Sequence, residues 1–334
     1  MNRSTIVLLV LAAFGLPLSA AAQAPGEGIW RNYDFVPGTR VIDVVSLESQ
    51  PLGRFPTSEL GYVRGNMQVV ERDGERWLET SGDGVARIEL AEETGDTYTV
   101  EFPARISAAS VGIRLFPVPL EGPIRSYAHD YVSFTSRPGV YREGTSLSSR
   151  DLRDIVEKDV IVRLQVDEGY AVVYVDSLPV AQVPGARFPT TGTLELHIDG
   201  SDRHKTYLGE VVVAVGLDDP YESLTGEGVF TTRGIQFDPE GRLRPESTPV
   251  LVSLADALTR ADTLRVTIEA HTDAEGDETV SEQGAAAVVA WLVDQGIEAG
   301  RLTAAGKGGS EPAASNDTPE GRHENRRVVV RVTP

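Results

Sequence analysis

Residues that can do chemistry are concentrated in two short runs near the C-terminus. His271-Thr272-Asp273 follows a strand expected at 264–270, and Asn325-Arg326-Arg327 begins the last expected strand. His271 has no second His or Cys at ligand spacing, so no metal site is predicted. No expected strand carries the paired carboxylates of a glycoside hydrolase. The sequence therefore predicts a non-enzymatic protein with no catalytic residue, no metal and no cofactor.

The elements that must position these runs alternate between strand and helix. Apolar residues at helical spacing follow a first strand, and Ser247 or Thr248 can cap that helix. Alternating strands and helices around one sheet predict an α/β sandwich spanning residues 229–334. The expected elements are strands 228–237, 264–270, 301–305 and 326–332, a helix around 250–258, a helix ending near Gly296 and a helix that begins at Thr318.

Four separated blocks of this domain resemble the OmpA-like peptidoglycan-binding domain. They are Phe237-Asp238 with Leu243-x-Pro245-x-Ser247, Ile268-x-x-His271-Thr272-Asp273-x-x-Gly276, Gly296-Ile297-x-x-x-Arg301-Leu302 with Gly306-x-Gly308, and Thr318-x-x-Gly321-Arg322-x-x-Asn325-Arg326-Arg327-Val328. In that family a carboxylate accepts the ammonium group of diaminopimelate, and a guanidinium holds its carboxylate with two hydrogen bonds. The resemblance implies that Asp273 supplies this carboxylate. It also implies that Asp238, Thr272 and Asn325 line the pocket.

The family's guanidinium is missing from its expected place. The element that carries it reads Val-Ser-Glu-Gln-Gly-Ala at 280–285, so Gly284 stands where the arginine is expected. The preceding loop is also shorter than usual. Glycine early in a helix costs about 1 kcal/mol relative to alanine, which indicates local remodelling. Arg326 is the candidate replacement, or else it braces the third helix and pairs with acidic neighbours. We therefore expect a degenerate site that binds peptidoglycan weakly.

The N-terminus reads as an export signal. A basic start, an apolar run at 6–18 and small residues up to Ala22 predict a cleaved signal peptide, 1–22. The run is shorter than the ~20 residues of a spanning helix, although a retained anchor is the alternative. The chain contains no cysteine for a disulfide framework or a lipid anchor. We expect a protein of the periplasm or outer membrane of a Gram-negative bacterium.

The charge of the chain limits its partners. Its formal net charge is −19, which repels nucleic acid and anionic lipid headgroups. No later segment approaches transmembrane length, so the mature chain is predicted to have no transmembrane helix and no nucleic-acid partner.

Residues 23–215 predict an all-β domain. Strands are expected at 97–102, 111–116, 131–135, 160–166, 171–175, 193–198 and 210–215. A transmembrane barrel is the alternative, but it needs strands of ~9–11 residues with aromatic girdles. Short strands at irregular spacing favour a soluble β-sandwich. The turn-rich residues 216–228 are expected to link it to the C-terminal domain.

The hairpin at 160–175, with residues 176–180 after it, resembles concanavalin A-like and laminin G-like jelly rolls. The resemblance implies that this domain binds a glycan or an envelope protein. Trp30 and Trp77 are candidates to stack on a sugar, and the acidic loop 199–202 with Asp83 is a candidate Ca²⁺ site, although core tryptophans and turn-forming aspartates fit as well. The leading hypothesis is a peptidoglycan-associated envelope protein. The alternative is a glycan- or protein-binding module with the C-terminal domain as a scaffold.

Overall fold

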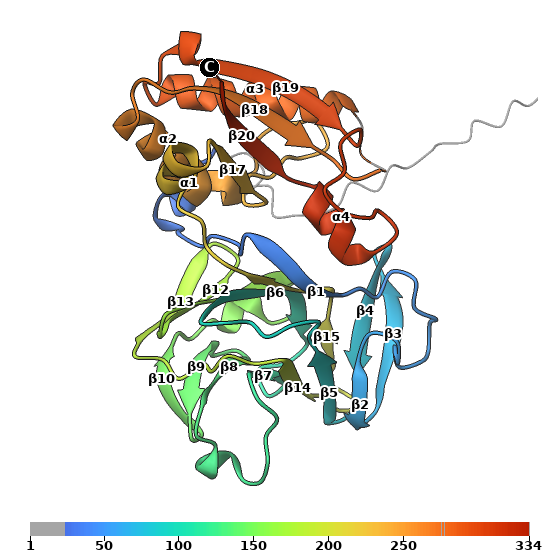
Figure 1. The fold of residues 1–334 in the computed structure, drawn as a ribbon. Coiled ribbons are helices and arrows are strands. Elements are labelled where there is room, and N and C mark those ends of the chain that lie inside the picture. Colours follow the sequence, from blue (N-terminus) through green and yellow to red (C-terminus); the bar gives the residue numbers. More distant parts are fainter. Residues whose placement is uncertain (1–23, 275, 277, 334) are drawn as a thin grey trace, which may run out of the picture.

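The fold was analysed in a computed structural model that describes residues 24–274, 276 and 278–333. The expected signal peptide, 1–22, lies outside the described residues. A β-rich N-terminal domain and an α/β C-terminal domain lie one against the other (Figure 1). Within the described part of the chain, every helix is too short or too polar to cross a membrane.

Two antiparallel sheets form the N-terminal domain. The nine-stranded sheet has the order β13-β12-β11-β6-β15-β4-β3, with β16 pairing β6 and β1 pairing β16. The seven-stranded sheet has the order β10-β9-β8-β7-β14-β5-β2. The bounds are η1 Gly28–Asn32, β1 Arg40–Val45, β2 Gly61–Arg64, β3 Met67–Arg72, β4 Glu75–Thr80, β5 Gly84–Glu89, β6 Thr97–Ile106, β7 Gly112–Phe116, η2 Ile124–Ser126, β8 Asp130–Phe134, β9 Gly139–Arg142, β10 Thr145–Ser149, η3 Arg153–Ile155, β11 Val160–Asp167, β12 Tyr170–Val175, β13 Leu178–Pro184, β14 Thr193–Asp199, β15 Thr206–Leu208 and β16 Val211–Val215.

The two sheets pack face to face, which confirms the predicted sandwich. In β11, Val162 and Leu164 face the core with residues from both sheets. The predicted hairpin is also present, because β11 pairs with β12 up to Asp167 opposite Tyr170. Its two turn residues, Glu168 and Gly169, both have positive φ, which suits the twist of the strands. Alternation along short strands therefore predicted this domain correctly.

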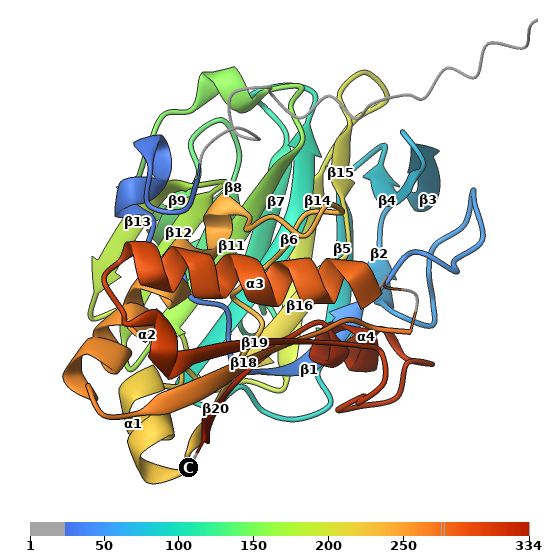
Figure 2. The same cartoon turned by 90° about the horizontal axis from the view of Figure 1, so that it is seen from above.

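The C-terminal domain has one four-stranded sheet in the order β17-β20-β18-β19. Strand β18 is parallel to β19 and antiparallel to β20. Helices α2 and α3 bury their apolar faces against it, and Figure 2 shows α3 lying along β18 and β19. The bounds are α1 Pro220–Gly226, β17 Val229–Thr232, η4 Pro245–Ser247, α2 Thr248–Arg260, β18 Arg265–His271, α3 Glu278–Asp294, η5 Ala299–Arg301, β19 Leu302–Gly308, α4 Pro319–Asn325 and β20 Val328–Thr333.

Two expectations about the start of this domain were wrong. The strand expected at 228–237 ends at Thr232, because Arg233 turns toward the sandwich and donates a hydrogen bond to the Gly38 carbonyl at 2.6 Å. The expected turn-rich linker contains a helix, α1, which Asp219 caps through two backbone N–H groups. Leu224 of α1 is buried in the C-terminal core. The connection is therefore packed against the C-terminal domain.

Residues 24–38 run along the boundary between the domains. Tyr33 and Phe35 pack edge-on against Tyr174 of β12, on the outer face of the nine-stranded sheet. The Gly26 N–H donates to Oγ1 of Thr248 at 2.8 Å, at the start of α2. This segment thus contacts both domains.

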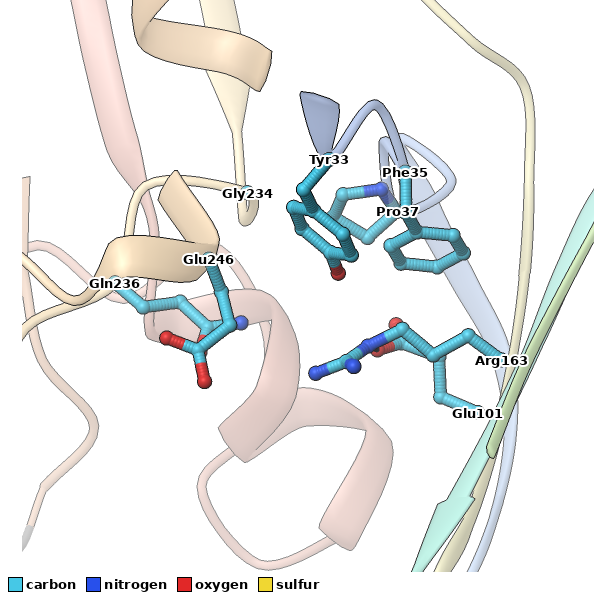
Figure 3. A pocket seen from close by; sticks show the side chains of 8 residues that line it. All are labelled: Tyr33, Phe35, Pro37, Glu101, Arg163, Gly234, Gln236 and Glu246. Atoms are coloured by element: carbon cyan, nitrogen blue, oxygen red, sulfur yellow. Dashed lines mark hydrogen bonds and ion pairs between the residues drawn. The ribbon is translucent and has the colours of Figure 1, made fainter. Parts of the chain in front are cut away.

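A small cavity at this boundary is shown in Figure 3. Arg163 of β11 is buried, and its Nε donates a hydrogen bond to Oε2 of Glu101 at 3.1 Å. The Cζ atom of its guanidinium lies 5.8 Å from the centroid of the Tyr33 ring. Glu246 of the C-terminal domain faces the same space (Figure 3). The cavity measures about 10 Å³, enough for a single water molecule at most. It is therefore too small for a ligand larger than water.

The two tryptophans expected as sugar-stacking candidates are core residues. Trp30 and Trp77 are each 4% exposed. The guanidinium of Arg72 lies over Trp77, with its Cζ atom 5.7 Å from the centroid of the indole ring. Neither indole face is available to a ligand.

Candidate functional site

The end of strand β18 brings the two sequence runs together. His271 donates its backbone N–H to the Arg327 carbonyl at 2.9 Å, so the turn after β18 lies beside the start of β20. There Nη1 of Arg326 lies 2.5 Å from Oδ2 of Asp273. The Asp273 side chain is 13% exposed and that of Arg326 is 46% exposed. A carboxylate and a guanidinium thus meet at a surface that solvent reaches.

Asn325 holds the neighbouring loop in place. Its side-chain oxygen accepts hydrogen bonds from the N–H groups of Ala313 and Ala314, at 2.7 and 3.0 Å. Its amide nitrogen donates to the Ala314 carbonyl and to Oδ1 of Asn316, both at 2.9 Å. The same Asn316 oxygen accepts from the N–H of Ala274, next to Asp273. Asn325 is fully buried, so the expectation that it lines the pocket is corrected: it positions the Asp273 turn.

Asp238 organises its own turn. Its Oδ1 accepts the backbone N–H groups of Glu240 and Arg242, and its Oδ2 pairs with Nε of Arg242 at 2.6 Å. Partial burial raises the pKa of Asp238, but these hydrogen bonds stabilise the charged carboxylate and hold the pKa below its ordinary value. Both carboxylate oxygens are therefore engaged within the 238–242 turn, and a role for Asp238 in the pocket beside Asp273 stays a prediction.

Thr272 lies within the turn itself. Its N–H donates to the Gly308 carbonyl at 3.0 Å, which ties the turn to the end of β19. Its Oγ1 is buried and has no hydrogen-bond partner among the described residues. Thr272 is therefore half-buried beside Asp273, and its role in the pocket stays a prediction.

Gly284 on α3 occupies the place where the family arginine is expected. A Cβ atom at this position would lie 2.9 Å from the ring of Phe237. The aromatic ring therefore lies against the helix backbone where a side chain would begin. This contact is a physical reason for a glycine at position 284, and the sequence analysis did not predict that Phe237 makes it.

We expect Gly284→Arg to lower the free energy of unfolding by about 1–3 kcal/mol, because the new side chain must displace Phe237. Urea unfolding checks this, with Ala286→Arg on the exposed face of α3 as the control. In a double-mutant cycle with Phe237→Ala, the two changes should couple by at least ~0.5 kcal/mol. Strict additivity would contradict the contact.

His271 is buried without a hydrogen-bond partner for either ring nitrogen among the described residues. His271 ends β18, and its ring is enclosed. Burial and the nearby charge of Arg327 lower the pKa of His271 from 6.5 to about 4, although Glu269 and Glu311 oppose this. The imidazole is therefore neutral at pH 7.

This shift predicts a loss of stability in acid. Between about pH 4 and 6.5 the unfolded chain binds a proton at His271 that the folded chain does not, so stability falls as the pH is lowered through this window. The full shift corresponds to about 3 kcal/mol, which solvent screening reduces to about 1–2 kcal/mol. Urea unfolding at pH 7.5 and pH 5 should show this extra loss in the native chain and not in His271→Gln. Equal acid sensitivity of both chains would contradict it.

Helix α4 fastens the site to the sandwich. Edge strand β1 directs the N–H groups of Val41 and Val44 toward α4, where Glu324 and Glu320 accept them at 2.5 and 3.2 Å. Figure 1 shows α4 seated above β1. Two further contacts join α4 to the sandwich: a hydrogen bond between Nε2 of His323 and Oε1 of Glu210 at 2.8 Å, and an ion pair of Arg322 with Glu48 at 3.3 Å. Arg326 follows α4 directly, so domain docking helps to fix its position.

Nothing in the sequence of α4 predicted this docking. Glu320 and Glu324 are four residues apart on a short polar helix, a pattern that is usual on a solvent-exposed face. Only the fold shows that an unpaired strand edge lies opposite them.

Fold and site together define an α/β sandwich domain with a carboxylate–guanidinium pair at the end of its central parallel strand. Residues 237–326 match the OmpA family, and this part of the chain is an OmpA family domain. Outer-membrane lipoprotein YfiB of Pseudomonas aeruginosa is 41% identical over 93 residues, which are 27% of this chain and 55% of that protein. Peptidoglycan-binding protein ArfA of Mycobacterium tuberculosis is 39% identical over 101 residues, 29% of this chain and 31% of that protein.

The chain spans about half the length of the first curated relatives it matches. Among solved structures, the cell wall anchor of the T6SS from Pseudomonas aeruginosa is 28% identical, covering 34% of this chain and 98% of its own, with a TM-score of 0.30. The Emp47p carbohydrate recognition domain is 13% identical, covering 54% of this chain and 96% of its own, with a TM-score of 0.39. Neither superposition is close enough to carry an argument about function.

Proposed function

We propose that the protein is a non-enzymatic component of the cell envelope that associates with peptidoglycan through residues 237–326. The observation that carries this is the ion pair of Asp273 with Arg326 in an OmpA family domain. An exported chain with this function resides in the periplasm or at the outer membrane. The N-terminal domain we assign to the concanavalin A-like jelly rolls, on the strength of its two packed antiparallel sheets.

The geometry suits a ligand that carries an ammonium and a carboxylate group. The Asp273 carboxylate attracts the ammonium, and the half-exposed Arg326 guanidinium can donate to the carboxylate. The two protein groups are also paired with each other, so a ligand must share them. We therefore expect weaker binding than a site with separate charges would give, in line with the degenerate site predicted from the sequence.

Sedimentation with purified peptidoglycan tests the proposal. The native chain should be retained, Asp273→Ala should be released, and Asp262→Ala, an exposed control in the same domain, should behave like the native chain. Failure of the native chain to sediment would overturn the function. Unchanged retention of Asp273→Ala would overturn the site.

A further inference from the structure

The boundary between the two domains has a connection at one end and a contact at the other. Figure 1 shows α1, which follows the connection from β16, and α4 at opposite ends of this boundary. Gly216, directly after β16, has a φ of 78°, a conformation that glycine adopts without strain. At the far end, α4 rests on β1. A chain connection at one end and a separable contact at the other is the arrangement of a hinge and a latch.

Helix α4 belongs to the C-terminal domain, but the sandwich holds it. It packs against β1 more extensively than against any other helix or strand. Glu320 and Glu324 lie four residues apart on one face of α4, and they accept the N–H groups of Val44 and Val41 on the edge of β1. Arg326 is the C-cap residue of α4. The contact that holds α4 therefore also holds the guanidinium of the proposed site.

Three carboxylates meet at this contact. Asp43 of β1 precedes Val44, whose N–H Glu320 accepts, and the charge of Glu320 acts on both Asp43 and Glu59. Burial, together with the charges of Glu320 and Glu59, raises the pKa of Asp43 from 3.8 to about 6, although a hydrogen bond from the Ala91 backbone opposes this. Burial and Glu320 also raise the pKa of Glu59. Above pH 6 an ionised Asp43 faces like charges across the boundary, which opposes docking of α4.

Cationic side chains of α4 hold the same contact together. His323 bonds Glu210 at 2.8 Å, and Arg322 pairs with Glu48. Although burial raises it, the hydrogen bond from His323 and the charges of His323 and Arg326 lower the pKa of Glu210. This carboxylate therefore stays ionised in mild acid, where a proton on His323 would strengthen the bond between them.

Acid is therefore expected to favour the docked position of α4. Asp43 binds a proton more readily when α4 is docked, where its pKa is about 6, than when α4 has left and the pKa returns toward 3.8. The resulting stabilisation of the docked form is complete below pH 3.8 and is lost as the pH rises through 6. Between pH 8 and pH 5 the docking equilibrium should shift by up to about tenfold toward the docked form.

We propose that the contact of α4 with β1 is a latch that acid strengthens, and that closure of the latch positions Arg326 for the wall peptide. Glu320 and Glu324 are its positioning residues. The inference rests on the proposed function, because the wall peptide is the ligand whose affinity the latch sets. By thermodynamic linkage, a peptide that binds the docked form more tightly also drives docking.

Calorimetry of the full chain with a diaminopimelate-containing wall peptide, at pH 5 and at pH 8, tests the latch. We expect the native chain to bind about threefold to tenfold more tightly at pH 5. Asp43→Asn, which mimics the protonated side chain, should bind at pH 8 nearly as tightly as the native chain binds at pH 5, and its affinity should change by less than about twofold between the two. Asp202→Asn, an exposed aspartate between β14 and β15, is the control and should keep the native pH dependence.

Two variants of Glu324 test positioning at a fixed pH of 5. Glu324→Ala should weaken peptide binding at least about threefold, because the Val41 N–H loses its acceptor. Glu324→Gln keeps an acceptor and should restore most of the affinity, while the exposed Glu298→Ala should bind like the native chain. Amide hydrogen exchange reports the latch directly: the protection factors of Val41 and Val44 should be higher at pH 5 than at pH 8, and higher again with peptide bound.

Equal native affinities at the two pH values, or a pH dependence that survives in Asp43→Asn, would overturn the latch and leave the proposed function in place. Native affinity in a Glu324→Ala chain that has lost protection at Val41 would also overturn it, because docking would then not position Arg326. A native chain that binds the peptide at neither pH would overturn the proposed function and, with it, the effect on affinity. Unchanged protection of Val41 and Val44 between pH 5 and pH 8 would overturn the latch itself.

Discussion

Arg326→Ala is expected to weaken the binding of a soluble diaminopimelate-containing wall peptide by about thirtyfold or more. Arg326 supplies the guanidinium beside Asp273, and removal of one partner from a charge-assisted pair typically costs about 2–5 kcal/mol of binding. Arg326→Lys should give an intermediate affinity, because an ammonium keeps the charge but cannot hold a carboxylate with two parallel hydrogen bonds. Calorimetry with the full chain measures both.

Arg260→Ala is the matched control for this series. Its side chain is 51% exposed on α2, against 46% for Arg326, and it pairs with Asp256. Its affinity should equal that of the native chain. If Arg326→Ala binds as tightly as the control, Arg326 only braces the Asp273 turn, which is the alternative that the sequence left open.

Asn325→Ala is expected to lower the free energy of unfolding of the C-terminal domain by about 2–4 kcal/mol. The change removes all four hydrogen bonds of the buried Asn325 side chain, to Ala313, Ala314 and Asn316, and each typically contributes about 0.5–1.5 kcal/mol. For a domain of this size the thermal midpoint should fall by roughly 8–25 °C. Differential scanning calorimetry measures it, with the exposed Gln295→Ala as the control.

The outcome of Asn325→Ala also separates positioning from ligand contact. At a temperature where the variant is folded, its affinity for the wall peptide should fall through disorder of the 313–316 loop and the Asp273 turn. A variant as stable as Gln295→Ala, with weakened binding alone, would contradict the positioning role and restore Asn325 to the pocket wall.

Much of this fold is local enough to be predicted from the sequence. Alternation in residues 160–167 predicted β11, and the Thr318-Pro319 start predicted α4, whose first turn Thr318 does cap. The expected strand at 228–237 failed because Arg233 bonds the Gly38 carbonyl, nearly two hundred residues away in the chain. Local propensity has no information about such a contact.

The candidate site was predictable only in part, for the same reason. Asp273 and Arg326 were each named from the sequence, but their pairing depends on β18 lying beside β20. The four side-chain hydrogen bonds of Asn325 depend on the path of the 313–316 loop. The sequence of this loop has no hydrophobic periodicity from which its path could be predicted.

The most direct test of the central claim is calorimetry of the full chain with two wall peptides that differ at one residue, diaminopimelate or lysine. Both residues carry a side-chain ammonium, and only diaminopimelate adds the carboxylate that Arg326 is proposed to hold. We predict that the native chain binds the diaminopimelate peptide about tenfold or more tightly, a difference of at least ~1.4 kcal/mol, and that Arg326→Ala binds the two peptides equally. Equal affinities in the native chain, or a preference that survives in Arg326→Ala, would contradict the account.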